Sequence, residues 1–186
     1  MPFVSVTLIE GYDEEAKERL CHALTGAVRQ VVPADLDAIT IALNEVSTAG
    51  YMRGGVARTP APALPDAEAT VHQFLAHMEA RDLNAASAML GDGFTMTFPG
   101  NVTMTKLAGL VDWASTRYRF VRKTYEHFDT ASGDKGPIVY CYGTLNGEWL
   151  DGDPFDGIRF IDRFETEGGK LIRQDVWNDM GEMRRA

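Results

Sequence analysis

The chain has few of the features that would let it bind nucleic acid or cross a membrane. Lys and Arg number 18 against 27 Asp and Glu, which gives a net charge of −9, and no basic run is longer than Arg184-Arg185. Little is therefore available to neutralise a phosphate backbone. No stretch approaches the roughly 18 uninterrupted apolar residues of a spanning helix, and no basic segment opens the chain. We expect neither a membrane span nor a signal peptide, and a cytoplasmic location.

Cysteine and histidine are also scarce. The two cysteines, Cys21 and Cys141, are 120 positions apart, and the four histidines show no H-x-H or H-E-x-x-H spacing. This usage is typical of reduced thiols and argues against a disulfide framework or a zinc site. We therefore expect no metal and no cofactor.

What the chain does have is enough apolar sequence to fold, with one clear break. Hydrophobic residues make up 45% of the sequence, and Pro60, Pro62 and Pro65 interrupt it within six positions. Proline removes amide donors and favours extended backbone. We predict a first domain over residues 1–57, a linker over 58–65 and a second domain over 66–186.

The first domain has the pattern of a β-α-β unit. A β-rich segment over 3–9 is followed by Asp13, which can cap a helix that continues to Pro33, and alternating residues over 39–46 predict a second strand. One helix between two strands predicts a right-handed crossover and parallel pairing. Because so short a unit buries little apolar surface, we expect a homo-oligomer.

In the second domain the helices come first and the sheet follows. The pattern predicts helices over 66–80, 82–90 and 105–118, a strand over 93–98, and long β segments over 121–131, 138–150 and 157–180, the last broken at Gly168-Gly169. Such segregation indicates an α+β fold in which a curved antiparallel sheet wraps over helices and leaves a cone-shaped cavity.

Pro2 is the first candidate for catalysis. Once Met1 is removed, Pro2 carries a secondary amine, and a free α-amine has a pKa near about 7.7–8.0 that burial lowers. Such an amine can be neutral at pH 7 and take a proton from carbon next to a carbonyl. Most prolines at this position, however, only permit Met1 removal or begin a strand.

The order of features around Pro2 resembles the 4-oxalocrotonate tautomerase family over residues 2–55. Pro2 begins a strand, Glu10-Gly11 precede an acid-capped helix, and the second strand ends at Asn44-Glu45-Val46 before a tail from Tyr51 to Gly55. The resemblance implies a proline base at Pro2, a trimeric or hexameric ring of β-α-β units, and keto–enol isomerisation of small 2-oxo acids.

Two positions depart from the family pattern. Tyr12 and Thr40 stand where the family has the arginines that bind the substrate carboxylate and stabilise the dienolate, so a dicarboxylate substrate is disfavoured. The aromatic wall is kept as Tyr51, and Arg53 can supply a cation or be a solvated loop residue. Our candidate substrate contacts in this domain are Tyr12, Thr40, Tyr51 and Arg53.

Asp162 is the candidate acid of the second domain. The strand period of two places it on the same face as Ile158, Phe160 and Phe164. If that face lines the cavity, burial favours the neutral carboxyl, which can donate a proton or a hydrogen bond. The alternative is an ion pair with an arginine such as Arg119 or Arg173.

Residues 66–183 resemble the nuclear-transport-factor-2-like (NTF2-like) fold, which includes SnoaL polyketide cyclases and ketosteroid isomerase. The resemblance rests on the segments 73–84 and 93–100 and on the closing run 157–179. It maps the isomerase oxyanion-hole aspartate onto Asp162, but the catalytic base onto Phe98 and the oxyanion tyrosine onto Phe74, so the steroid mechanism does not carry over. Tyr142 and Trp177 either line the cone or fill it.

Together these features predict a fused enzyme with no bound cofactor. In this hypothesis Pro2 is a general base on a carbonyl substrate, and the cone binds or cyclises a mostly apolar, less anionic compound. The alternative is a non-catalytic ligand-binding protein in which the first domain only drives assembly.

Overall fold

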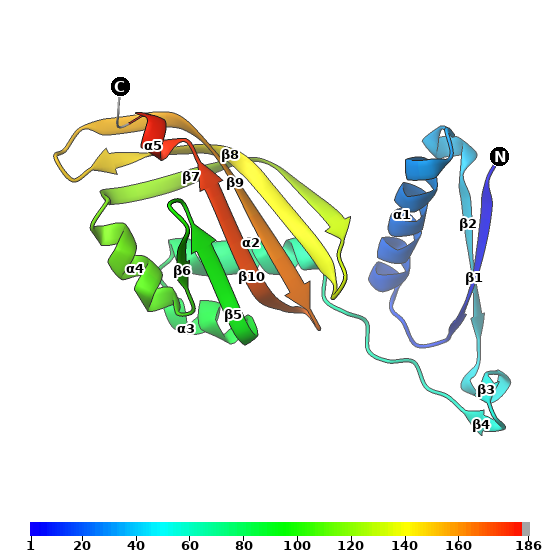
Figure 1. Cartoon of the computed structure of the whole chain (residues 1–186). Helices are drawn as coiled ribbons and strands as arrows, with labels where there is room; N and C mark the ends of the chain where they lie inside the picture. Colours follow the sequence, from blue (N-terminus) through cyan, green and yellow to red (C-terminus); the bar gives the residue numbers. More distant parts are fainter. Residues whose placement is uncertain (184–186) are drawn as a thin grey trace. The chain divides into compact units, whose positions relative to one another are not determined.

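The computed structural model describes residues 1–183 and divides the chain into two compact units, Met1–Ala63 and Leu64–Ala186. The Pro-rich segment predicted as a linker falls at this division. Each unit has its own sheet, so the two are described separately (Figure 1).

The first unit is a β-α-β module with the predicted parallel pairing. Strands β1 (Phe3–Ile9) and β2 (Thr40–Val46) pair in parallel, with Phe3 opposite Thr40 and Ile9 opposite Val46. Helix α1 (Glu14–Val31) joins them, and the Asp13 carboxylate accepts a hydrogen bond from the Ala16 amide at 2.8 Å. A short hairpin of β3 (Met52–Arg53) and β4 (Val56–Ala57) follows β2.

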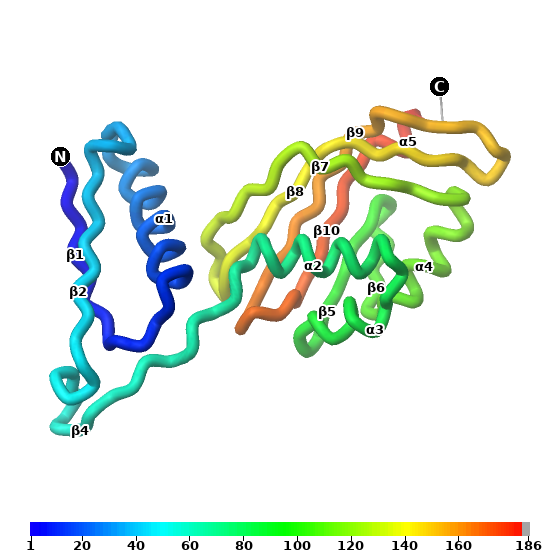
Figure 2. Tube along the Cα trace, turned by 180° about the vertical axis from the view of Figure 1, so that it is seen from behind, coloured from blue at the N-terminus to red at the C-terminus, as the bar shows by residue number. Residues whose placement is uncertain are grey.

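The second unit is a six-stranded sheet with helices on one face. The strand order is β6-β5-β10-β9-β8-β7, and the strands are β5 (Leu90–Phe98), β6 (Val102–Met104), β7 (Tyr118–Ser132), β8 (Pro137–Trp149), β9 (Pro154–Glu167) and β10 (Lys170–Asn178). The helices are α2 (Ala67–Glu79), α3 (Leu83–Ala88), α4 (Leu107–Ser115) and α5 (Met180–Met183). Figure 2 shows α2 lying across one face of this sheet.

The α+β class and the curved sheet are confirmed, with two differences of detail. Strand β10 pairs with β5 in parallel while its other neighbour β9 is antiparallel, so the sheet is mixed. Strand β6, three residues long, was not predicted, because so short a segment carries almost no periodicity.

The core of the second unit lies between the sheet and α2. Its fully buried side chains come from both layers and include Val71 and Phe74 of α2, Met96 of β5, Val139 and Cys141 of β8, and Ile158 and Phe164 of β9. The rings of Phe74 and Phe164 meet edge to face at 5.9 Å between centroids. This packing fixes α2 over the sheet.

Candidate functional site

Pro2 lies at one end of the two-stranded sheet of the first unit. Its carbonyl accepts a hydrogen bond from the Thr40 amide at 3.1 Å, which extends the β1–β2 ladder by one residue. Pro2 is half-buried, and Met1, which precedes it, is 97% exposed. The strand therefore fixes the position of the proline ring while the chain end remains accessible.

The other candidate residues of this unit lie at the opposite end of the sheet. Tyr12 follows β1, and Tyr51 and Arg53 follow β2, so all three come after the carboxyl ends of the parallel strands. Seven residues of strand separate these ends from Pro2, which corresponds to roughly 20 Å. Within one chain the fold brings Pro2 together with Thr40 but not with Tyr12, Tyr51 or Arg53.

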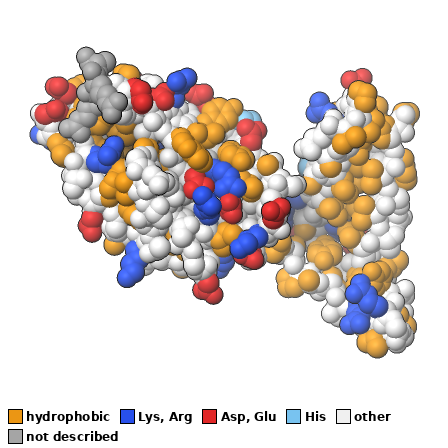
Figure 3. Space-filling view, in the orientation of Figure 1, with side chains coloured by type: hydrophobic (Ala, Val, Ile, Leu, Met, Phe, Trp, Pro, Cys, Tyr) orange, Lys and Arg blue, Asp and Glu red, His pale blue; other side chains and the backbone are white. Residues whose placement is uncertain are grey.

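Much apolar surface of the first unit is uncovered. Helix α1 contains no buried residue, and Phe3, Val31 and Leu36 are 65%, 84% and 59% exposed. Figure 3 shows hydrophobic side chains over much of the visible face of this unit. Surface of this kind marks an interaction site.

In the second unit, Asp162 is completely buried in a polar cluster. Its Oδ2 accepts hydrogen bonds from the Lys123 ammonium and, at 3.3 Å, from Nε2 of Gln174. The predicted face is correct, and the alternative of an arginine partner is wrong, since the cation is a lysine. Arg119 pairs with Glu148 and Arg173 with Asp175. Gln174 faces Asp162, so the strand period turns its neighbour Arg173 to the opposite side.

Lys123 and Gln174 connect this cluster to a cavity of about 400 Å³ between α2, α4 and β7. Both line the cavity, and the Lys123 side chain is 24% exposed. Asp162 does not line the cavity itself and is connected to it by its hydrogen bonds with Lys123 and Gln174. The Lys123 ammonium also lies 4.5 Å from the centre of the Phe160 ring, a cation–π contact.

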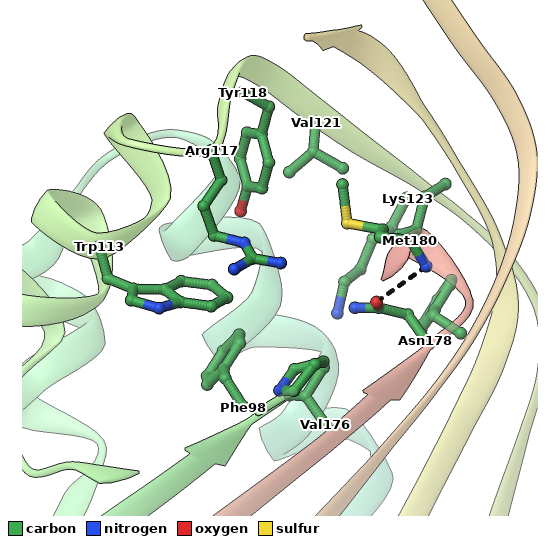
Figure 4. A pocket seen from close by; sticks show the side chains of 12 residues that line it. Phe98, Trp113, Arg117, Tyr118, Val121, Lys123, Val176, Asn178 and Met180 are labelled. Atoms are coloured by element: carbon green, nitrogen blue, oxygen red, sulfur yellow. Dashed lines mark hydrogen bonds between the residues drawn. The ribbon is translucent and has the colours of Figure 1, made fainter. Parts of the chain in front are cut away.

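A smaller, adjoining hollow of about 50 Å³ shares Phe98, Tyr118, Val121 and Lys123 with the larger cavity. Figure 4 shows the Arg117 guanidinium beside the Trp113 ring, facing the space that Lys123 also borders. The guanidinium carbon of Arg117 is 4.5 Å from the centre of that ring.

Two tyrosines of the cavity wall remain neutral. Burial raises the pKa of Tyr125 far above its ordinary value, and the charge of Asp162 acts in the same direction. Burial also raises the pKa of Tyr118, although the nearby Arg117 and Arg81 oppose this shift. A neutral phenol can donate a hydrogen bond to a bound oxygen.

The predicted aromatic contacts of the second unit divide between the cavity and the outer face of the sheet. Phe74 and Phe98 line the cavity. Tyr142 and Trp177 do not belong to that wall, since they are 37% and 52% exposed and alternate with the buried Cys141 and Val176. The expectation that they line or fill the cone is therefore wrong, because the strand period turns them to the outer face.

Lys123 and Arg117 were missed from the sequence. The available signal was that Lys123 alternates in step with Val121 and Tyr125 on β7, so a cation occupies the inward face of a strand. Among residues 1–183, no group of three or more His, Cys, Asp or Glu side chains is arranged to hold a metal ion, and no helix is long and apolar enough to cross a membrane.

Comparison with known proteins separates the same two parts. A family model described as tautomerase enzyme matches residues 2–59. A probable tautomerase of Bacillus cereus is 36% identical over 55 residues, which are 30% of this chain and 90% of that protein, and a probable tautomerase of Bacillus anthracis matches to the same extent.

Solved structures match the remaining part. An NTF2-like protein of unknown function from Burkholderia pseudomallei superposes with a TM-score of 0.56 at 19% identity, covering 64% of this chain and 95% of that one. A putative SnoaL-like polyketide cyclase from a Jannaschia species gives 0.54 at 16% identity, covering 69% and 96%. The chain therefore belongs to the tautomerase family through residues 2–59, and its second unit has the NTF2-like fold.

Proposed function

We propose that this protein is a keto–enol isomerase in which Pro2, freed by removal of Met1, is the general base of the first unit. The observation that carries the proposal is that Pro2 directly precedes β1 and is held in register by the Thr40 amide at 3.1 Å. A secondary amine so placed has a fixed direction of attack, which proton transfer from carbon requires.

The proposed site requires a second copy of the chain. Tyr12, Tyr51 and Arg53 follow the far ends of the strands, so they can face a proline only if it belongs to another copy. The exposed side chains of Phe3 and Val31 provide apolar surface for such an assembly. Arg53 of one copy would then supply a cation near Pro2 of another. This cation would replace the two family arginines, whose positions are occupied here by Tyr12 and Thr40.

The second unit is proposed to hold a larger carbonyl compound. Its cavity has the size of a small-molecule site, and Phe74, Phe98 and Tyr125 form much of its wall. The structural neighbour described as a putative SnoaL-like polyketide cyclase supports a cyclase role for this unit. Here Asp162 positions the Lys123 ammonium at the cavity wall and has no direct contact with a bound compound.

The test combines intact mass with proton exchange. Mass spectrometry should show the chain without Met1, and the purified protein should catalyse exchange of the C3 protons of 2-oxobutanoate with deuterated water. Pro2→Ala is expected to lower this rate at least about a hundredfold, the usual effect of losing a positioned base. Pro33→Ala, a matched substitution just beyond α1 in the same unit, should leave the rate unchanged.

A non-catalytic role in assembly and ligand binding is the second candidate, favoured by the two missing arginines. It predicts that Met1 remains attached, or that Pro2→Ala exchanges protons as fast as the unaltered chain. Either result would overturn the proline mechanism.

A further inference from the structure

The cavity of the second unit carries an excess of cations in a chain that is otherwise strongly acidic. The cavity and its adjoining hollow are together bordered by four cations, one carboxylate of the wall and the buried partner of one cation, namely Arg81, Arg117, Arg122, Lys123, Glu79 and Asp162. Cations are therefore in excess by two, although the whole chain has a net charge of −9. Such an inversion concentrates positive potential inside one concave site.

The stability of the fold does not explain why Lys123 lies at the cavity wall. Its partner Asp162 is completely buried, and a buried ion pair contributes little to stability compared with apolar packing. Retaining an ammonium at the wall makes sense if it meets an anion there.

Gln174 provides an independent sign that the cavity binds a ligand. It is 4% exposed, it lines the cavity, and its Oε1 has no hydrogen-bond partner, while its Nε2 is committed to Asp162. A buried acceptor left unpaired is costly, so this oxygen is suited to accept a hydrogen bond from a bound hydroxyl or enol.

Arg117 supplies a second cation, from the adjoining hollow that shares Lys123 with the cavity. The Trp113 ring supports its guanidinium, and its buried Nε also has no hydrogen-bond partner. A guanidinium with free donors binds a carboxylate strongly and directionally. The neutral phenols of Tyr118 and Tyr125 add two donors on the same wall.

We propose that this cavity binds an aromatic carboxylate that also carries a hydroxyl or enol group. The ligand extends from the cavity into the adjoining hollow. Its carboxylate lies between Lys123 and Arg117, its rings pack among Phe74, Phe98 and Trp113, and its hydroxyl donates to Gln174. The proposal refines the expected mostly apolar substrate by adding one anionic group. It rests on the proposed role of the second unit as the substrate-binding part.

The experiment compares two probes of nearly identical shape, 6-hydroxy-2-naphthoate and its neutral carboxamide, by isothermal titration calorimetry on the full chain. The acid is expected to bind at least about tenfold more tightly than the amide. Arg117→Met keeps an apolar side chain against Trp113 and should lower the affinity for the acid at least about tenfold, while the affinity for the amide stays within about twofold.

The second variant pair isolates Lys123 without leaving a buried charge unpaired. Lys123→Met combined with Asp162→Asn removes both charges together and should weaken acid binding by a similar factor. Lys135→Met is the matched control, because Lys135 is 64% exposed and lies outside the cavity lining. Circular dichroism of each variant checks that the fold is kept.

Several outcomes would overturn the proposal. These are equal affinity for the two probes, no binding of the acid at millimolar concentration, or the same affinity in Arg117→Met as in Lys135→Met. The titration involves no catalytic step, so its failure is distinct from a failure of the Pro2 exchange test.

Discussion

At the scale of single residues, β7 shows how the same strand face carries both packing and polarity. Lys123 and Tyr125 are two positions apart and both line the cavity, where Tyr125 also packs edge to face on Phe160 at 5.7 Å. Burial and the charge of Asp162 keep the Tyr125 phenol neutral. We therefore expect Tyr125 to make the free energy of unfolding of the second unit depend on pH in the alkaline range.

Tyr125→Phe tests this coupling. Up to the ordinary pKa of 10.0, the phenol is neutral in the folded and the unfolded chain, and its contribution is constant. As the pH rises above 10, the unfolded phenol ionises while the folded one does not, so the free energy of unfolding falls. The variant should lose less stability between pH 10 and 11, by up to about 1.4 kcal/mol per pH unit.

Urea unfolding followed by tryptophan fluorescence measures this slope, because all three tryptophans lie in the second unit. Tyr142→Phe, on the exposed outer face, is the control and should follow the unaltered chain. Identical slopes for both variants would contradict the assignment.

The sequence pattern identified Asp162 as a residue of the inward face but missed Lys123. The period of two was enough to place Asp162 on the inward face, since its neighbours Phe160 and Phe164 are plainly apolar. It was not enough for Lys123, because a lysine on an amphipathic strand is usually solvated, and only the packing of α2 and α4 makes that face concave.

At the scale of elements, the β7–β8 pairing depends on glycines opposite irregular positions of β7. The register shifts between Tyr125 and His127, and Gly143 of β8 faces this position. A Cβ atom built on Gly143 would lie 2.0 Å from the Thr124 carbonyl oxygen. A bulge bends a strand and increases its twist, so this close approach helps the sheet curve around the cavity.

Gly143→Ala is therefore expected to destabilise the second unit by at least about 2 kcal/mol, because backbone must move to admit the methyl group. Gly109→Ala in α4 is the matched control. Its Cβ would meet nothing within 4 Å, and a helical alanine should stabilise by up to about 1 kcal/mol. Urea midpoints of the two variants that shift in the same direction would show that the close approach is unimportant.

Element types were predictable here because their signals are local. Asp13, Asp66 and Asp82 each cap the helix that follows, through bonds of 2.8, 2.8 and 3.0 Å to backbone amides. The parallel β10–β5 pair was not predictable, since it joins segments that are far apart in the chain and have no turn between them.

At the scale of the whole molecule, the chain consists of two units with different degrees of burial. The second unit contains a core of fully buried side chains such as Phe74 and Phe164, whereas α1 of the first unit contains none. The second unit therefore has the burial needed for independent folding, and we expect the first to depend on assembly.

A chain shortened to residues 64–186 tests this difference. It should unfold cooperatively at the same urea midpoint as the full chain when tryptophan fluorescence is followed, since its core draws on no residue of the first unit. Sedimentation should show a smaller assembly than that of the full chain. A clearly lower midpoint, or an unchanged assembly size, would contradict the proposed division of roles.

The sequence by itself determined the longer elements, the break near Pro60 and the strand that begins after Pro2, because caps, prolines and strand alternation act over a few residues. The tertiary structure decided which side chains share a site. It paired Asp162 with Lys123, turned Tyr142 and Trp177 outward, and separated Pro2 from Tyr51. Those outcomes depend on sheet curvature and strand direction, which arise only when distant segments pack together.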